Sequence, residues 1–271
     1  MKAAMRAALS RSARPGGKIT AAKLLSSALP WIVIGGLLWM WEFLIGDSLA
    51  FVLPRPSLIV WQIFLVFPLL GRNMWSTVSN ALFGFAAGSA FGLACAVAFV
   101  YNATFAKTVY PHTLVLRSLP LMALLPILNG ILGTGAPSKI TIVALASFFP
   151  VLVNAVQGLT SVSMSTVELM HSLNATRRDI FWKVRLPSSL PYLFTGLKIS
   201  ASGAILAAII SEYMYAVKGI GALIVTFMFG ARVLELWAAM LVSALLSVLF
   251  YWAIRIVERL CIPWGKSVRE A

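Results

Sequence analysis

Six apolar segments, each about long enough to cross a lipid bilayer, restrict this chain to a membrane architecture. The hydrocarbon core is about 30 Å thick, so a helix that rises 1.5 Å per residue needs about 20 apolar residues to span it. Backbone polar groups inside hydrocarbon must bond within their own segment, which favours helices. We therefore predict an all-α membrane protein of about six transmembrane helices, at approximately residues 29–45, 78–100, 109–132, 140–160, 199–217 and 234–256.

The composition and the first residues support the same class. Charged residues make up only 11% of the chain and the mean hydropathy is +0.92, as is typical of membrane proteins. We divide the sequence into a basic tail at 1–27, a transmembrane domain at 28–262 and a second tail at 263–271. The first tail holds six Lys and Arg residues and no acid. Before an apolar span it is expected to be an uncleaved cytoplasmic anchor and not a nucleic-acid site.

Charge asymmetry predicts the orientation. If the N-terminus is inside, sixteen of the 22 Lys and Arg residues lie in cytoplasmic parts and five lie outside, while Arg117 falls within the third segment. Positive residues concentrate on the cytoplasmic side of membrane proteins. Both termini and the polar loop at 161–198 are therefore expected in the cytoplasm.

Prolines predict where the helices are interrupted. Pro54 and Pro56, followed by Pro68 and Gly71, are expected to break the first long connection and to leave a short interfacial helix at about 57–65. The third segment contains three prolines and is expected to be kinked or broken, because of Pro111, Pro120 and Pro126.

The polar loop has the pattern of a short helix, a turn and a second helix. Ser165 with Glu168, and Thr176 with Asp179, have the three-residue spacing of a capping box, in which two side chains satisfy free backbone donors at a helix start. Asn174 lies between them and tolerates the left-handed conformation of a helix end.

Two prolines, Pro187 and Pro191, are expected to stop the second helix of this loop. Ile180, Phe181 and Val184 share one face of that helix, so it can bury one side on protein and leave its basic residues in water.

Residues that carry catalytic chemistry are scattered. Cys95 and Cys261 lie far apart in the sequence, and His112 and His171 are isolated. The chain has no glycine-rich phosphate loop and no Ser, His and acid constellation in one polar neighbourhood. We therefore expect no catalytic site, no metal site and no bound cofactor in this chain.

The polar loop resembles the cytoplasmic signature of bacterial ABC importer permeases. That signature reads Glu-Ala-Ala, three residues, Gly, nine residues, Ile, one residue, Leu-Pro. This chain has residues at the corresponding spacings, namely Glu168, Asn174, Val184, Leu186 and Pro187. It departs from the pattern at Leu169 and Met170, which replace the alanines, and at Asn174, which replaces glycine.

The resemblance continues over roughly residues 51–262, in the branch that imports nitrate, sulfonates, taurine and related molecules. Matching segments occur in the same order along the chain, at 53–57, 116–120, 124–126, 148–150 with Asn154, 211–213 and 219–221.

The resemblance implies a type I ABC importer permease-like fold, in which a coupling helix in this loop docks on a separate ATPase subunit that holds ATP-Mg. It also implies an extracytoplasmic solute-binding protein and a second permease copy, most simply in a homodimer. The residues that it implies in ATPase coupling are Glu168, Leu169, Met170, His171, Ser172, Leu173, Asn174, Ala175, Thr176, Arg177 and Arg178, while Leu186, Pro187 and Pro191 would set the loop geometry. The alternative for the loop is an amphipathic helix that rests on anionic membrane lipid.

Two ionisable residues are candidates for the transport pathway because charges are costly inside hydrocarbon. Arg117 lies within the third segment, and Glu212 lies near the end of the fifth. Glu212 has a second interpretation, in which it braces the loop at Gly219 and Gly221.

Two other classes of function stay open. An ion-coupled secondary transporter would need a proton or ion relay, whereas the acids here are scattered. A membrane scaffold would need no pathway. The substrate itself, a sulfonate-, nitrate- or taurine-like anion or a vitamin precursor, is not determined by the apolar and small residues of the spans.

Overall fold

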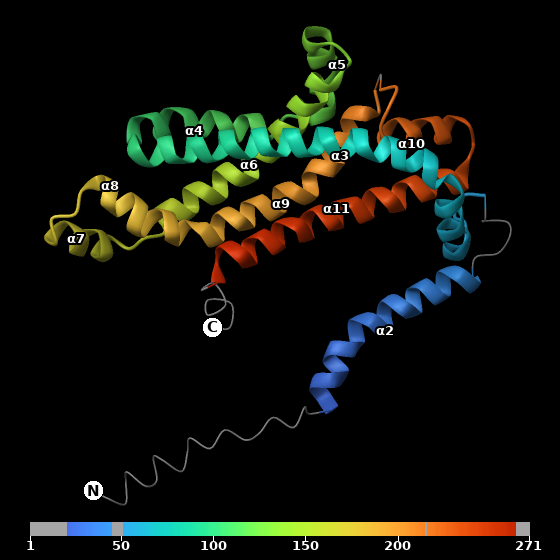
Figure 1. Cartoon of the computed structure of the whole chain (residues 1–271), viewed down its shortest axis with the longest axis horizontal. Helices are drawn as coiled ribbons and strands as arrows, with labels where there is room; N and C mark the ends of the chain where they lie inside the picture. The colour runs from blue at the N-terminus through green and yellow to red at the C-terminus, as the bar shows by residue number, and fades with distance from the viewer. Residues whose placement is uncertain (1–20, 45–50, 215, 264–271) are drawn as a thin grey trace, which may run out of the picture. The chain divides into compact units, whose positions relative to one another are not determined.

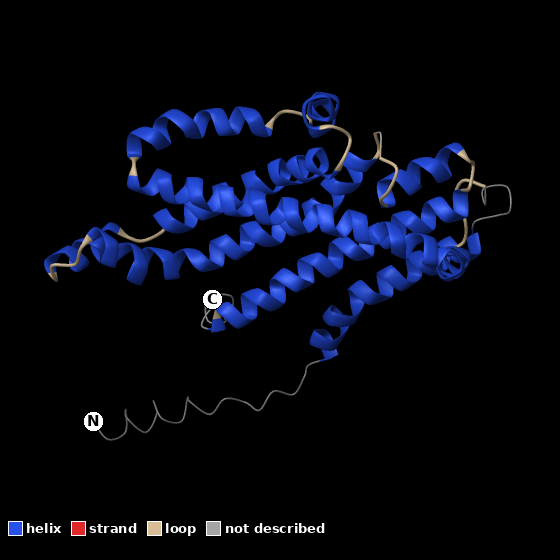
Figure 2. Cartoon of the chain, turned by 45° about the horizontal axis from the view of Figure 1, so that its top comes forward, coloured by secondary structure: helices blue, strands red, loops and turns tan. Residues whose placement is uncertain are grey.

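The computed structural model describes residues 21–44, 51–214 and 216–263. Most of the predicted basic tail and nearly all of the C-terminal tail lie outside these residues. All regular elements in the described part are helices, as Figure 2 shows. The predicted all-α class is therefore confirmed. The chain divides into two units, Met1–Ile59 and Val60–Ala271, and each is described by itself.

In the first unit, the end of α2 (Ala21–Leu44) is tied to the residues that follow it. The Glu42 carboxylate accepts hydrogen bonds from the Ser57 amide at 3.1 Å and the Ser57 hydroxyl at 2.6 Å. The Trp41 indole donates to the Pro54 carbonyl at 3.1 Å. These bonds hold the connection before α3 close to the preceding helix.

Helix α3 (Pro56–Tyr101) corrects the predicted break around Pro68. It is a continuous helix of 46 residues, and Pro68 lies inside it. The predicted interfacial helix at about 57–65 forms the first turns of α3 and is not a separate element. A proline removes one backbone bond, but the apolar residues on both sides of Pro68 maintain the helix around it.

The third predicted span is broken, as its prolines indicated. Helix α4 (Ala103–Arg117) ends shortly before Pro120, which has an extended backbone and precedes α5 (Leu121–Leu132). The other two prolines of the segment, Pro111 and Pro126, lie inside the helices. The break follows because the residue before a proline is pushed away from the helical conformation.

Four helices in the described residues are long and apolar enough to span a membrane. They are α3, α6 (Ala136–Thr160), the continuous helix Arg177–Glu212 and α11 (Val233–Cys261). The apolar helices Ala28–Leu44, α5 and α10 (Ile220–Phe229) are shorter. The fifth predicted span thus begins earlier than expected, and its helix ends at Glu212.

Close packing of α6 against its neighbours forms the centre of the second unit. Helices α6, α9 (Leu186–Glu212) and α11 lie side by side (Figure 1). A Cβ atom added to Gly88 of α3 would lie 2.2 Å from the Ala144 carbonyl oxygen of α6, so glycine is needed there. The buried Ser200 hydroxyl of α9 donates to the Ser147 carbonyl of α6 at 3.0 Å. Eight of the thirteen buried residues of α9 are glycine, alanine or serine, which let the backbones approach.

Candidate functional site

The N-cap of helix α7 (Met164–Ser172) lies two residues before Ser165, where the capping box was predicted. Its N-cap is Ser163, whose hydroxyl accepts a hydrogen bond from the Thr166 amide at 3.3 Å. The predicted cap by Ser165 and Glu168 is therefore wrong. Ser163 and Ser165 are both of the residue type that caps helices. The extended backbone of Ser163 places its hydroxyl within reach of the free amides at the helix start. Glu168 consequently lies within α7, with its side chain exposed.

The turn after α7 matches the prediction for Asn174. This residue has a positive φ of 56°. Its amide donates to the His171 carbonyl at 2.9 Å, and the Ala175 amide donates to the Met170 carbonyl at 3.0 Å. These two bonds form a Schellman motif, which satisfies carbonyls that a helix end leaves free. The asparagine thus ends α7 in the way that glycine usually does.

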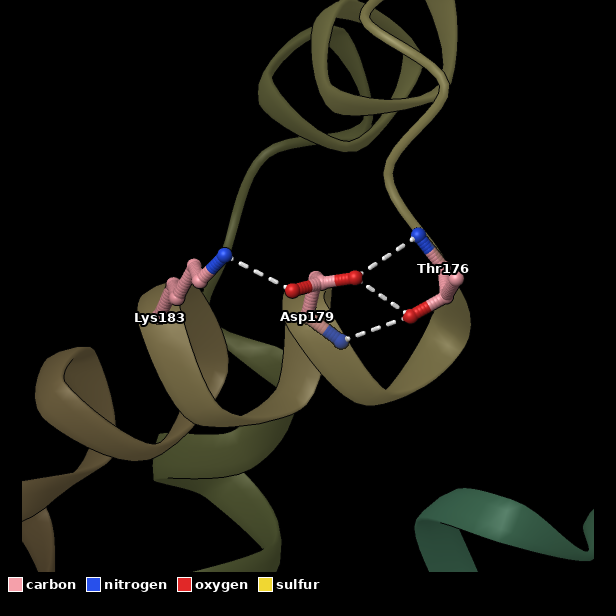
Figure 3. Close-up of polar contacts among 3 residues, drawn as sticks. All are labelled: Thr176, Asp179 and Lys183. Atoms are coloured by element: carbon pink, nitrogen blue, oxygen red, sulfur yellow. Dashed lines mark hydrogen bonds and ion pairs between the residues drawn. The ribbon is translucent and has the colours of Figure 1, made fainter.

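The second predicted capping box is confirmed at the start of α8 (Arg177–Ile180). The Thr176 hydroxyl accepts from the Asp179 amide at 3.2 Å, while the Asp179 carboxylate accepts from the Thr176 amide at 3.2 Å. Lys183 pairs with the other carboxylate oxygen at 2.7 Å (Figure 3). The capping box fixes the direction in which the chain leaves the turn.

The predicted stop at Pro187 and Pro191 is wrong. The helix continues from α8 through a π-helical turn, η1 (Phe181–Arg185), into α9. In this turn the Leu186 amide bonds to the Phe181 carbonyl, one residue further back than in an α-helix. The wider turn accommodates the Pro187 ring, which would otherwise clash with the carbonyl four residues earlier. Pro191 lies inside α9.

Helix α7 has no buried residue and lies, with α8, at one end of the second unit (Figure 1). The side chains of Leu169 and Leu173 are 60% and 69% exposed. They lie four residues apart on one face of α7, next to an exposed turn. Exposed leucines on a rigid polar loop form a contact surface that the chain itself leaves uncovered.

A buried polar cluster forms a second candidate site, where α9 ends and α10 begins. Glu212 is 1% exposed and accepts hydrogen bonds from the Thr77 hydroxyl of α3 at 2.8 Å and the Gly221 amide at 3.0 Å. The Thr77 hydroxyl also accepts from the Ile220 amide at 2.8 Å. We call Glu212, Thr77, Asn73 and the amides of residues 219–221 the polar clasp.

Asn73 completes the polar clasp by accepting from the Gly219 amide at 2.8 Å. Three successive amides at the start of α10 are thus bonded to side chains of α3 and α9. Asn73 and Thr77 were not among the sequence-predicted residues. The signal that could have found them is a pair of polar residues four apart in an apolar helix, although it does not name their partners.

The contacts of Glu212 agree with the second interpretation from the sequence, in which it braces the loop at Gly219 and Gly221. Gly219 has φ of 121°, and a Cβ atom at this position would lie 2.2 Å from the Glu212 carboxyl carbon. Only glycine at position 219 therefore lets the loop backbone lie against the Glu212 carboxylate. Contact of Glu212 with a transported solute stays a prediction, as does the role of Arg117. Arg117 is the last residue of α4, and its side chain lies outside the described part.

None of the described residues forms a group of three His, Cys, Asp or Glu side chains that could hold a metal ion. Both sites connect helices: the loop of α7 and α8 is exposed, and the polar clasp is largely buried.

Comparison with known proteins assigns a family to this architecture. The family described as binding-protein-dependent transport system inner membrane component matches residues 88–262, which include the loop and most of the long helices. The formylaminopyrimidine transport permease protein ThiX of Halalkalibacterium halodurans is 30% identical over 241 residues, covering 85% of this chain and 93% of that protein.

Other similar proteins carry different substrate names. The putative aliphatic sulfonates transport permease protein SsuC of Bacillus subtilis is 28% identical and covers 88% of this chain and 84% of its own length. The taurine transport system permease protein TauC of Escherichia coli is 29% identical, with coverage of 74% and 70%. A chain of the inward-facing MetNI methionine ABC transporter is similar in fold, with a TM-score of 0.64 at 21% identity, covering 72% of this chain and 97% of that chain.

Proposed function

The chain belongs to the family of binding-protein-dependent transport system inner membrane components, and we propose that it forms the solute pathway of an ATP-driven importer. As a member of this family it is the permease component of an ABC transporter and a multi-pass inner membrane protein. Its four long apolar helices agree with that location. The direction of transport, the energy source and the solute belong to the proposal.

The exposed face of α7 supports coupling to an ATPase. Leu169 and Leu173 stand outside the apolar spans, between the Schellman turn at Asn174 and the N-cap at Ser163. A helix fixed at both ends transmits a displacement instead of absorbing it, so it can act as a lever. Its exposed leucines would fill a groove of the ATPase, and their exposure outside the apolar spans is the observation that supports the proposal.

The remaining partners follow from the same arrangement. ATP and Mg²⁺ would be bound by the ATPase, and this chain would bind no cofactor. A second copy of the permease would complete the pathway, and an extracytoplasmic binding protein would deliver the solute. The loop that holds α7 would lie in the cytoplasm together with both termini, as the excess of positive charge predicts.

The solute would be a small anion or a vitamin precursor. Relatives named for formylaminopyrimidine, sulfonates, taurine and nitrate all align over most of this chain. Since permeases of similar sequence serve different solutes, the binding protein would make the selection.

Purification of the full chain from its native membrane in mild detergent tests this function. We expect an ATPase with a phosphate-binding loop to remain bound, and its ATP hydrolysis to rise when solute-loaded binding protein is added. The Leu169→Ala/Leu173→Ala variant should insert normally but lose the ATPase. Uptake driven by an ion gradient without ATPase would favour a secondary transporter, and co-purification without stimulated hydrolysis would favour a scaffold.

A further inference from the structure

A cavity of about 180 Å³ lies at the base of the loop, between the end of α3 and the helices that follow α7. Arg177, Arg185 and His171 supply its polar lining, and no acidic side chain lies among the described residues that line it. The nearby carboxylate of Asp179 is already bonded to Thr176 and Lys183. The cavity is therefore positively charged and has no internal counterion.

The cavity opens on the face of α7 opposite the exposed leucines. Val167 and His171 line it and lie four residues apart, so they share one side of the helix. Leu169 is two residues from each, which at 3.6 residues per turn places it about 200° around the helix. A partner that binds only the leucine face would therefore leave the cavity free for another occupant.

Aromatic residues of the kind found at membrane–water boundaries lie at the cavity. Tyr101 is the last residue of α3, and its ring lies 5.3 Å from that of Phe181. Tyrosine and tryptophan concentrate where apolar spans meet the headgroup layer, and the exposed Trp182 lies next to Phe181. The two arginines therefore stand at the depth of lipid headgroups.

We propose that this cavity binds the anionic headgroup of a phospholipid, with the phosphate held by Arg177 and Arg185. Arginine forms charge-assisted, bidentate hydrogen bonds with phosphate oxygens. The volume is below the roughly 300–1,000 Å³ of sites that enclose a whole small molecule, so it suits a headgroup whose acyl chains stay in the bilayer. A bound headgroup would link the end of α3 to α7 and α8. It would thereby hold α7, the helix proposed to act as the lever, close to the membrane.

Lipid titration of the purified full chain, followed by native mass spectrometry, tests the assignment. The probes are phosphatidylglycerol and phosphatidylcholine with the same acyl chains. We expect the wild type to retain one phosphatidylglycerol at least about tenfold more tightly than phosphatidylcholine, and Arg177→Ala/Arg185→Ala to abolish that preference. The control Arg178→Ala/Arg259→Ala removes the same charge outside the cavity and leaves Lys183 paired with Asp179, and should keep the preference within about threefold.

Further measurements distinguish a bound lipid from diffuse attraction, a free anion and the ATPase. Equal loss in both double variants would mean diffuse attraction and overturn the site. Displacement of the lipid by millimolar inorganic phosphate would identify a site for a free anion, and displacement by the ATPase would assign the cavity to the ATPase interface. Arg177→Gln/Arg185→Gln removes the charge but keeps a polar side chain with three carbons, and replaces the alanine pair if that pair is not monodisperse. The lipid measurement does not depend on ATPase coupling, so its failure is distinct from failure of the proposed function.

Discussion

The exposed loop and the polar clasp are both joints between helices, but they are built in opposite ways. The bonds that shape the loop join residues no more than five positions apart and lie in water, as at Thr176 and Asp179. Three bonds of the clasp join residues 135 to 146 positions apart, and they are buried, as at Thr77 and Glu212, or partly buried, as at Asn73 and Gly219. A lost bond in water is replaced by solvent, whereas a lost bond in the clasp leaves a buried polar group unpaired.

This contrast assigns different mechanical roles to the two sites. Local caps make α7 and the turn after it a stiff unit held by its own bonds, and the buried Phe181 connects that unit to the bundle. The clasp fixes α3, α9 and the start of α10 to one another, and so resists movement between them. We therefore expect changes in the clasp to lower stability, and changes in the loop to lower coupling at nearly constant stability.

The largest effect is expected at Gly219. Gly219→Ala forces a side chain into the left-handed region and against the Glu212 carboxylate, at a cost above about 3 kcal/mol. The unfolding midpoint in detergent, followed by tryptophan fluorescence, should fall by many degrees. Gly203→Ala is the matched control, because a Cβ atom there meets open space. Equal midpoints for the two variants would refute the clasp as a rigid joint.

Removal of the Thr77 hydroxyl should have the next largest effect. Thr77→Val keeps the shape of the side chain but leaves the Ile220 amide without its acceptor and Glu212 without one donor, at a cost of about 2–3 kcal/mol. Chemical denaturation should show this loss. Thr226→Val, whose hydroxyl bonds to its own helix on an exposed face, should change stability by less than about 0.5 kcal/mol.

The sequence predicted the local bonds of the loop better than the long-range bonds of the clasp. Asn174 and the Thr176–Asp179 box were found because each motif is complete within a few neighbouring residues. The cap at Ser163 was not predicted, because Ser165 with Glu168 fits the same local spacing and only the backbone distinguishes the two serines.

The clasp required tertiary information. Asn73 and Thr77 are ordinary polar residues in the sequence, and their partners lie more than 130 positions away. Pro68 and Pro187 were read as helix breaks because proline removes a donor. Long apolar flanks at Pro68 and a π-helical turn before Pro187 make that loss tolerable, and neither is visible in residue type alone.

In the loop, Asn174→Val should reduce transport more than stability. A β-branched residue resists a φ of 56°, at a cost of about 1–2 kcal/mol confined to the end of α7. We expect substrate-stimulated ATP hydrolysis to fall severalfold while the unfolding midpoint stays within about 1–2 °C, because the turn is exposed and melts locally. Asn174→Gly supports the same turn and should retain wild-type coupling. Coupling that survives the valine variant would show that α7 need not be fixed at this end.

The smallest effect is expected at Lys183, whose ion pair with Asp179 is 2.7 Å long but lies in water. The lysine side chain is 69% exposed, so solvent screens the pair and Lys183→Ala should cost less than about 0.5 kcal/mol. The capping box should persist, because Thr176 and Asp179 bond to each other's backbone without the lysine. Denaturation and ATPase stimulation should both match the wild type. A larger loss would mean that the charge network, and not the cap, shapes the loop.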